Sequence, residues 1–207
     1  MNFQRATRLS LALISALTAT ASLHAADWPQ ILGPNRNGVV VGDTIAATWP
    51  KDGPPIRWQR KVGEGFSGPA VADGKLVLFH RVADQEVVEC MEAHTGKVLW
   101  KHGYPTRYRD TFGFDNGPRA VPTIYKGLIY TYGADSVLTC LELAEGKALW
   151  SVDLKKQYKA DTGFFGPACS PLVEGNAVML NIGGDGDAGI VAFNKDTGAL
   201  IWKSTDA

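Results

Sequence analysis

Short runs of apolar residues, broken by glycine-centred turns, recur three times along the chain. Each occurrence is an apolar strand pattern, a turn that contains glycine, and a second apolar strand pattern, at 69–78, 122–130 and 171–180. Glycine supplies the positive φ that a tight hairpin turn requires. Nowhere in 26–207 does an apolar pattern of helical period continue for three turns, so the pattern predicts short β-strands joined by hairpins.

An eleven-residue segment that ends in tryptophan follows each hairpin pattern. The three segments, 90–100, 140–150 and 192–202, align without gaps, and each carries a glycine four positions before its tryptophan. The glycine suits the turn between two strands, and the tryptophan is the large apolar residue expected at the contact between neighbouring repeats. The predicted structural residues of the repeat are Gly96, Trp100, Gly146, Trp150, Gly198 and Trp202.

Each repeat is predicted to form four strands, which in the second repeat are Ala120–Ile124, Leu128–Gly133, Val137–Glu142 and Ala148–Asp153. A period of 50 to 52 residues with four strands per unit is typical of a propeller blade, a small twisted sheet that buries its faces against its neighbours. The sequence therefore predicts an all-β fold, a β-propeller with four-stranded antiparallel blades, of which about three are present.

The domain boundaries follow from the repeat. The predicted blades are 62–103, 104–154 and 155–207, and 26–61 is an N-terminal segment that contains one lone strand, Ile56–Lys61. Propellers usually close with about four to eight blades, so three blades make an incomplete ring. We expect a truncated copy of a longer parent chain that holds the remaining blades, with closure of the ring by other chains as the alternative.

The first 25 residues have the character of a signal peptide. Arg5 and Arg8 make a positive start, Leu9–Ala21 is apolar apart from serine and threonine, and Ala25 places a small residue at the cleavage position. The apolar stretch is too short to span a membrane, and no cysteine follows the cleavage position to carry a lipid anchor. These features predict a periplasmic or secreted protein.

Charge and cysteine content narrow the possible partners. Lysine plus arginine and aspartate plus glutamate both number 21, so the formal net charge is zero, and no basic run is present to recruit nucleic acid or an anionic membrane.

Cys90 and Cys140 stand where the third repeat has Ala192. Equivalent positions of successive blades are too far apart for a disulfide, so both cysteines are predicted to be small buried residues.

The tryptophan segment resembles a known repeat. The pattern Ala192-x-Asn194-x-x-Thr197-Gly198-x-x-x-Trp202 is similar to the tryptophan-docking motif of the pyrroloquinoline-quinone (PQQ) type propeller repeat. That motif occurs in quinoprotein alcohol dehydrogenases, in BamB-like outer-membrane assembly lipoproteins and in many exported proteins of unknown role. The opening segment 27–38 resembles the mature start of the last group. The resemblance covers 27–207 and specifies the fold far better than the activity.

The resemblance implies about seven or eight blades in a full-length relative, with the N-terminal strand completing the last blade. It also leaves an enzyme as the alternative, namely the N-terminal part of a PQQ-dependent alcohol or aldose dehydrogenase with PQQ and Ca²⁺ at the ring centre. The adjacent cysteines and the catalytic aspartate of those enzymes have no match here, and the histidines lack metal-ligand spacing. We therefore expect a non-catalytic binding or assembly scaffold with no metal site and no assigned cofactor.

The connection 104–119, the longest between predicted blades, mixes arginines, aspartates and asparagine with four aromatic residues, and 155–166 has a similar character. Long charged and aromatic loops on a rigid scaffold often bind ligands, and arginine forks beside aromatic rings suit an anionic or sugar-like ligand. The alternative is that the rings cap the blade ends and the charges pair locally. The expected partner is an unidentified protein or a small carbohydrate-like ligand. The candidate ligand-binding residues are Arg107, Arg109, Asp115, Asn116 and Arg119.

Overall fold

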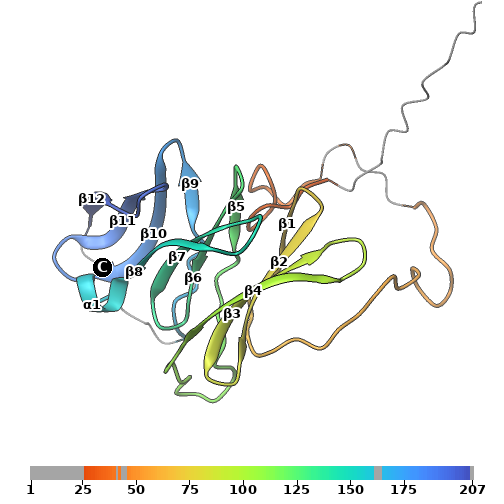
Figure 1. The fold of residues 1–207 in the computed structure, drawn as a ribbon, viewed down its shortest axis with the longest axis horizontal. Helices are drawn as coiled ribbons and strands as arrows, with labels where there is room; N and C mark the ends of the chain where they lie inside the picture. The colour runs from red at the N-terminus through yellow and green to blue at the C-terminus, as the bar shows by residue number, and fades with distance from the viewer. Residues whose placement is uncertain (1–25, 41, 43–45, 161–164, 206–207) are drawn as a thin grey trace, which may run out of the picture.

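The computed structural model describes residues 26–40, 42, 46–160 and 165–205, and the predicted signal peptide, 1–25, lies outside them. Within this part of the chain, twelve strands form three separate four-stranded antiparallel sheets, as predicted for propeller blades (Figure 1). Strand order follows chain order in every sheet. The first strands of the three sheets lie next to one another, β1 beside β5 and β5 beside β9.

The first sheet consists of β1 (Ala70–Ala72), β2 (Lys75–Val82), β3 (Gln85–Glu92) and β4 (Val98–Pro105). The second consists of β5 (Thr123–Tyr125), β6 (Leu128–Tyr132), β7 (Val137–Glu142) and β8 (Ala148–Asp153). The third consists of β9 (Leu172–Glu174), β10 (Ala177–Gly184), β11 (Ala188–Asn194) and β12 (Leu200–Ser204). A short helix, α1 (Leu154–Tyr158), follows β8 and begins at Asp153, whose carboxylate accepts a hydrogen bond from the Lys156 amide.

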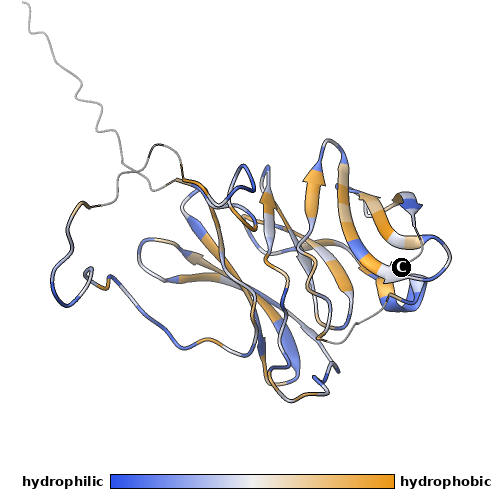
Figure 2. Cartoon of the chain, turned by 180° about the vertical axis from the view of Figure 1, so that it is seen from behind, coloured by the Kyte–Doolittle hydropathy of each residue, from blue (hydrophilic) through white to orange (hydrophobic). Residues whose placement is uncertain are grey.

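The three sheets pack against one another through two hydrophobic cores. Val77 of the first sheet and Ile129 of the second belong to one core, and Leu138 of the second sheet and Val178 of the third belong to the other. Figure 2 shows hydrophobic residues (orange) concentrated in the strands and hydrophilic residues (blue) at the turns. A small sheet cannot bury both of its faces alone, so the stacking of sheets supplies most of the hydrophobic stabilisation.

Each tryptophan of the repeat lies against the glycine of the following repeat. The Trp150 ring sits so close to Gly198 that a Cβ there would lie 2.8 Å from it. The Trp150 indole N–H donates a hydrogen bond to the Lys195 carbonyl at 3.0 Å, in the same turn as that glycine. Trp100 and Gly146 repeat this arrangement one sheet earlier. Because glycine has no Cβ, the indole packs directly on the backbone of the turn and joins neighbouring sheets.

Trp202 ends this series. It lies on β12, where every residue is exposed, and 40% of its own surface is exposed. In the described part of the chain, no sheet follows the third one to supply the next glycine turn. The outer face of the third sheet is therefore apolar and open.

The segment Ile56–Lys61, which the sequence predicts as a lone strand, forms no strand. A strand requires a partner backbone, and the pairing that does form nearby is a single bridge between Glu64 and Arg81. Trp58 nevertheless contacts Gly96 as the other tryptophans contact their glycines, and its indole N–H donates to a carbonyl of the same turn at 3.0 Å. The strand prediction was wrong because the local pattern reflects the tryptophan contact and not strand pairing.

All three cysteines are free thiols, which for Cys90 and Cys140 agrees with the prediction from the repeat register. Cys90 and Cys140 have no exposed surface, and each stands opposite the tryptophan of its own repeat in the strand register. Burial raises the pKa of Cys90 to about 11 and that of Cys140 to about 12. Both side chains therefore act as small core residues and stay protonated in the native state.

We expect a thiol reagent such as Ellman's reagent to label only Cys169, which is partly exposed, in the native protein at pH 8. All three cysteines should react after denaturation. An ordinary cysteine ionises near 9.0, so the folded state favours the protonated thiols, and this contribution to stability is lost as the pH rises above that value. Native labelling of more than one thiol, counted by mass spectrometry, would contradict this packing.

Candidate functional site

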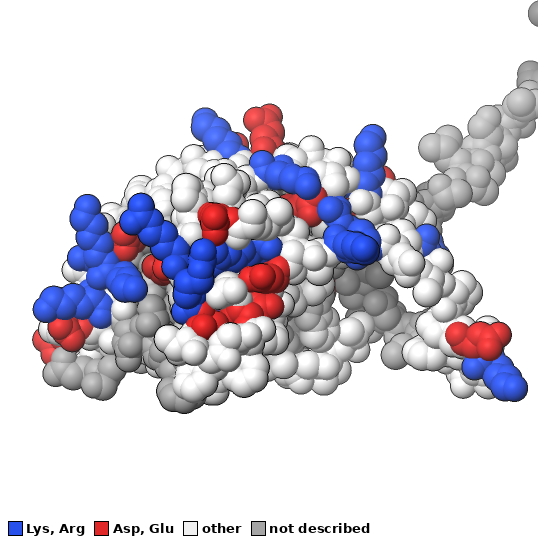
Figure 3. Space-filling model, turned by 90° about the horizontal axis from the view of Figure 1, so that it is seen from below, with Lys and Arg blue, Asp and Glu red and all other residues white. Residues whose placement is uncertain are grey.

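A cavity of about 340 Å³ lies where the connections leading into β1, β5 and β9 meet. These connections lie at the bottom of Figure 1, and Figure 3, which views the molecule from that side, shows basic and acidic side chains interspersed. All three sheets contribute to the wall of this cavity, here called the phenylalanine site. Its lining residues are Phe66 before β1, then Asp110, Phe114 and Arg119 before β5, and Phe165 and Ala168 before β9.

The phenylalanine rings of this site remain largely open to solvent. Phe66 is 64% exposed, Phe114 is 71% exposed and Phe165 is 55% exposed. Phe112 lies beside the site, with its ring centroid 6.3 Å from that of Phe114 and 5.8 Å from that of Phe165. A cluster of exposed phenylalanines around a cavity is unusual on a protein surface and marks a candidate binding site.

Asp110 shapes the loop that carries two of these rings. Its carboxylate accepts hydrogen bonds from the backbone amides of Phe112 at 3.0 Å, Phe114 at 3.0 Å and Asp115 at 3.2 Å. Its own amide donates to the side-chain oxygen of Asn116 at 3.0 Å. The bond from the Phe112 amide, helped by the other two amides, holds the pKa of Asp110 below its ordinary value, and partial burial opposes this shift. The loop is therefore built around an ionised carboxylate.

Arg119 is buried beneath the phenylalanine rings, and loop backbone occupies its donors. Its guanidinium donates to the Gly117 carbonyl at 2.6 Å and to the Asp115 carbonyl at 2.9 Å. The carbon at its centre also lies 5.0 Å from the Tyr108 ring centroid and 5.7 Å from that of Phe66. This guanidinium supports the loop by hydrogen bonding and the Phe66 and Tyr108 rings by cation–π contact.

Two charged residues outside the predicted set anchor the loop to the first two sheets. Arg81 on β2 is buried, and its guanidinium donates to the carbonyls of Tyr108 at 2.7 Å and Asn116 at 3.2 Å. Asp135, in the turn between β6 and β7, accepts from the Thr106 hydroxyl at 2.7 Å and from the Arg107 amide at 2.6 Å. The loop is thus fixed at both ends by side chains from different sheets.

The structure brings all five predicted ligand-binding residues into this one loop. Asp115 accepts a hydrogen bond from the Gly117 amide at 2.7 Å, and Asn116 and Arg119 make the loop contacts described above. Arg109 is exposed and pairs with Asp84 at 3.1 Å, while Arg107 contributes its backbone amide to Asp135. Their polar groups mainly hold the loop together, and their role toward a ligand stays a prediction.

The sequence contains a repeated pattern around these phenylalanines, although the charged residues of the loop are more conspicuous. A glycine-phenylalanine pair followed closely by glycine-proline occurs before each first strand, at 65–69, 113–118 and 163–167. The third copy lies partly outside the described residues, which include Phe165 and Gly166. Phe66 and Phe114 are the phenylalanines of the first two pairs and line the cavity, whereas Phe165, which also lines it, directly follows the pair of the third copy.

Glu86 on β3 ties the first sheet to the second from a fully buried position. Its two carboxylate oxygens accept hydrogen bonds from the Tyr104 hydroxyl at 2.6 Å and from the Ala134 amide at 2.7 Å. Burial raises the pKa of Glu86, although both hydrogen bonds act in the opposite direction. Burial and the neighbouring carboxylate also raise the pKa of Tyr104 well above its ordinary value. The bond from Tyr104 lies within the first sheet, and the bond from the Ala134 amide joins the first sheet to the second.

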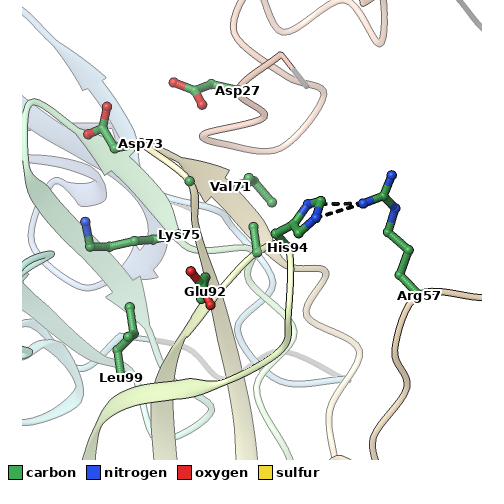
Figure 4. Close-up of a pocket in the computed structure, with 10 residues that line it drawn as sticks. Asp27, Arg57, Val71, Asp73, Lys75, Glu92, His94 and Leu99 are labelled. Atoms are coloured by element: carbon green, nitrogen blue, oxygen red, sulfur yellow. Dashed lines mark hydrogen bonds between the residues drawn. The ribbon is translucent and has the colours of Figure 1, made fainter. Parts of the chain in front are cut away.

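A second cavity, of about 660 Å³, separates the N-terminal segment from the turns of the first sheet (Figure 4). Three acidic residues, Asp27, Asp73 and Glu92, and three basic ones, Arg57, Lys75 and His94, line it with four small or apolar residues. Arg57 and His94 share a hydrogen bond of 2.9 Å between Nη1 and Nε2. Acidic and basic side chains both line the wall, and the arrangement selects no class of ligand.

A buried charged group holds the end of the N-terminal segment on the first sheet. The Glu89 carboxylate accepts from Arg60 at 3.0 Å and from Lys101 at 2.8 Å, and His80 Nε2 lies 3.6 Å away. The Gly63 amide donates to His80 Nδ1 at 2.8 Å, so Nδ1 carries no proton and the imidazole is neutral. Burial lowers the pKa of His80, which matches its role as an acceptor.

The dehydrogenase alternative requires residues for PQQ and Ca²⁺. Among the residues that the structure describes, no three histidine, cysteine, aspartate or glutamate side chains gather as metal ligands would. Asp110, the acidic residue of the phenylalanine site, is engaged by three loop amides. These residues do not fit the cofactor and its ion, and we assign none of them to either group.

A family model described as outer membrane protein assembly factor BamB matches residues 83–207, which is more than half of the chain. The chain belongs to this family of PQQ-like β-propeller repeat proteins. No curated protein sequence matches it. Within the described residues, no helix combines the length and the apolar character needed to cross a membrane.

Several solved structures are similar to this chain. A quinohemoprotein alcohol dehydrogenase from Pseudomonas putida HK5 is 23% identical with a TM-score of 0.50, over 68% of this chain and 20% of that one. A quinohemoprotein alcohol dehydrogenase from Comamonas testosteroni is 26% identical with a TM-score of 0.48, over 69% and 21%. BamB from Moraxella catarrhalis is 18% identical with a TM-score of 0.49, over 72% and 38%. The chain thus spans between a fifth and two fifths of these proteins.

Proposed function

We propose that this chain is part of an exported, non-catalytic propeller scaffold that binds an apolar group of a partner at the phenylalanine site. The observation that carries the proposal is the set of exposed rings, since the three phenylalanines that line the cavity are 55–71% exposed. The loop that carries Phe114 is held in place by hydrogen bonds between its own polar groups. Burial of exposed apolar side chains against a partner is favourable. Little conformational entropy is lost on binding when the loop that carries them is already fixed.

The kind of partner follows from the same wall. Its lining is mainly aromatic, and the one buried cation, Arg119, already lies 3.6 Å from Asp110 and bonds to two carbonyls. An apolar side chain of a protein partner suits this site better than an anion does. The family description as an assembly factor supports a protein partner, and the sequence of 1–25 supports a periplasmic or secreted location.

The proposal can be tested with the apolar dye 1-anilinonaphthalene-8-sulfonate. We expect the wild-type chain to bind it and the Phe114→Ala/Phe165→Ala variant to bind about tenfold more weakly, with an unchanged circular dichroism spectrum. Leu200→Ala, which removes an apolar side chain that is 43% exposed on β12, is the matched control and should bind as the wild type does. Equal losses in both variants, or none in either, would contradict a binding role for the phenylalanine site.

The enzyme alternative has a direct test of its own. PQQ and Ca²⁺ are added to the protein with a primary alcohol or an aldose, and reduction of dichlorophenolindophenol is followed by its absorbance. We expect no turnover above the protein-free control. Turnover that depends on both PQQ and the protein would replace the scaffold proposal with a dehydrogenase.

A further inference from the structure

The N-terminal segment 28–36 crosses the first strands of all three sheets. Trp28 exchanges two backbone hydrogen bonds with Val71 of β1, at 2.8 and 2.9 Å. The Pro29 carbonyl accepts from the Ile124 amide of β5 at 2.7 Å. Arg36 then donates to the Val173 carbonyl of β9 at 3.1 Å. Figure 1 draws this segment in red to orange beside β1 and β5.

The three contacted residues occupy the same position of the repeat. Val71, Ile124 and Val173 are each the middle residue of a three-residue strand. Each also stands two positions after the proline that opens its hairpin pattern. The segment therefore contacts one equivalent backbone position in three successive sheets, which indicates a specific arrangement and not incidental packing.

The segment is internally rigid enough to act as one piece. Gln30 is buried, donates to the Pro34 carbonyl at 3.1 Å and accepts from Arg36 Nε at 3.0 Å. The Trp28 ring lies on Gly33, where a Cβ would come within 2.7 Å of it. The Arg36 guanidinium thus joins the turn of the segment, through Gln30, to the third sheet.

The walls of the phenylalanine site run directly into the strands that this segment contacts. Phe66 leads into β1, Arg119 into β5 and Ala168 into β9. A three-residue strand spans only about 10 Å. A change in the relative position of the first strands therefore also moves the residues that line the cavity. The relative position of β1, β5 and β9 therefore sets the spacing of the rings.

We propose that residues 28–36 form a clasp that positions the three first strands and so sets the shape of the phenylalanine site, with Arg36 as its main positioning residue. The proposal rests on the proposed function, because it assigns a role in binding at that site. This role accounts for the 27–38 sequence, because the fold of the blades alone does not require that segment.

The test compares Arg36→Ala with Arg36→Lys in the full chain. Lysine keeps the charge but lacks the fork that reaches Gln30 and Val173 together. We expect the dissociation constant for 1-anilinonaphthalene-8-sulfonate to rise about fivefold in Arg36→Ala and by less in Arg36→Lys. Hydrogen exchange measured by NMR should become faster at the Ile124 amide. Arg57→Ala, which removes an exposed arginine elsewhere in the N-terminal segment, is the control and should change neither quantity.

Dye binding is measured at a temperature where every variant is folded, so that a loss of stability alone leaves the affinity unchanged. Faster exchange at Ile124 with wild-type dye affinity would overturn the positioning role and leave the clasp purely structural. An equal effect of Arg57→Ala would overturn its specificity. Failure of the proposed function is recognised separately, since Phe114→Ala/Phe165→Ala would then bind the dye as the wild type does.

Discussion

Replacing Trp150 with alanine is expected to lower the free energy of unfolding by about 3–5 kcal/mol. The indole covers Gly198 of the next repeat, donates to the Lys195 carbonyl at 3.0 Å, and lies 6.1 Å from the Tyr130 ring between centroids. Alanine would leave a cavity between the second and third sheets, and the Lys195 carbonyl would keep only the Tyr130 hydroxyl, at 3.2 Å, as a donor. Urea unfolding followed by circular dichroism measures the loss.

Trp202→Ala is the matched control for this prediction. Trp202 occupies the same position of its repeat but is 40% exposed, so its removal should cost less than about 1 kcal/mol. The two tryptophans occupy equivalent positions four residues after a glycine and differ in the presence of a following glycine turn against the indole. Similar losses in both variants would show that the indole stabilises its own sheet and not the contact between sheets.

Replacing Arg81 with methionine is expected to cost about 3–5 kcal/mol. The Arg81 side chain is 3% exposed, and its guanidinium donates to carbonyls of Ala83 at 2.7 Å, Tyr108 at 2.7 Å and Asn116 at 3.2 Å. Methionine fills a similar volume without a donor, so the Ala83 and Asn116 carbonyls lose the Arg81 donor, at about 1–3 kcal/mol for each one left buried. The Tyr108 carbonyl keeps Arg109 as a donor at 2.9 Å. The loop that carries Phe112 and Phe114 should loosen as well.

Arg109→Met separates this effect from the loss of a positive charge. Arg109 is 62% exposed, pairs with the same Asp84 carboxylate at 3.1 Å and donates to the Tyr108 carbonyl at 2.9 Å. That carbonyl keeps Arg81 as a donor in Arg109→Met, so this replacement should cost less than about 1 kcal/mol. Urea midpoints and dye affinities are compared for both variants. A stable Arg81→Met protein with normal dye binding would show that the loop does not depend on this anchor.

The last two strands of the second sheet were predictable to the residue, whereas its first strand begins at Thr123 and not at the predicted Ala120. Val137–Glu142 and Ala148–Asp153 form β7 and β8 with the predicted bounds. Apolar alternation and glycine turns are local signals, and a strand in a repeat has the same neighbours in every copy. The prediction failed at Ile56–Lys61, where the pattern resembles a strand but the backbone has no ladder partner.

The predicted site residues and the residues that line the cavity overlap only in part. The loop 104–119 does reach a cavity, but the sequence drew attention to its arginines, whereas the rings of Phe66, Phe114 and Phe165 line the wall. The sequence does not distinguish a charged side chain that binds a ligand from one that binds its own loop. Its partner depends on which backbone groups the fold brings within about 3 Å.

By itself, the sequence determined the repeat, the four strands of each unit, the burial of Cys90 and Cys140 and the residues that hold the turns. These properties depend on neighbours within a few positions or on comparison between copies. Only the tertiary structure decided that each tryptophan pairs with the glycine of the next repeat, that Arg119 serves its own loop, and that Arg36 bonds to Val173, 137 residues away. Contacts over such separations exist only when stacked sheets bring distant segments together, because no local propensity encodes them.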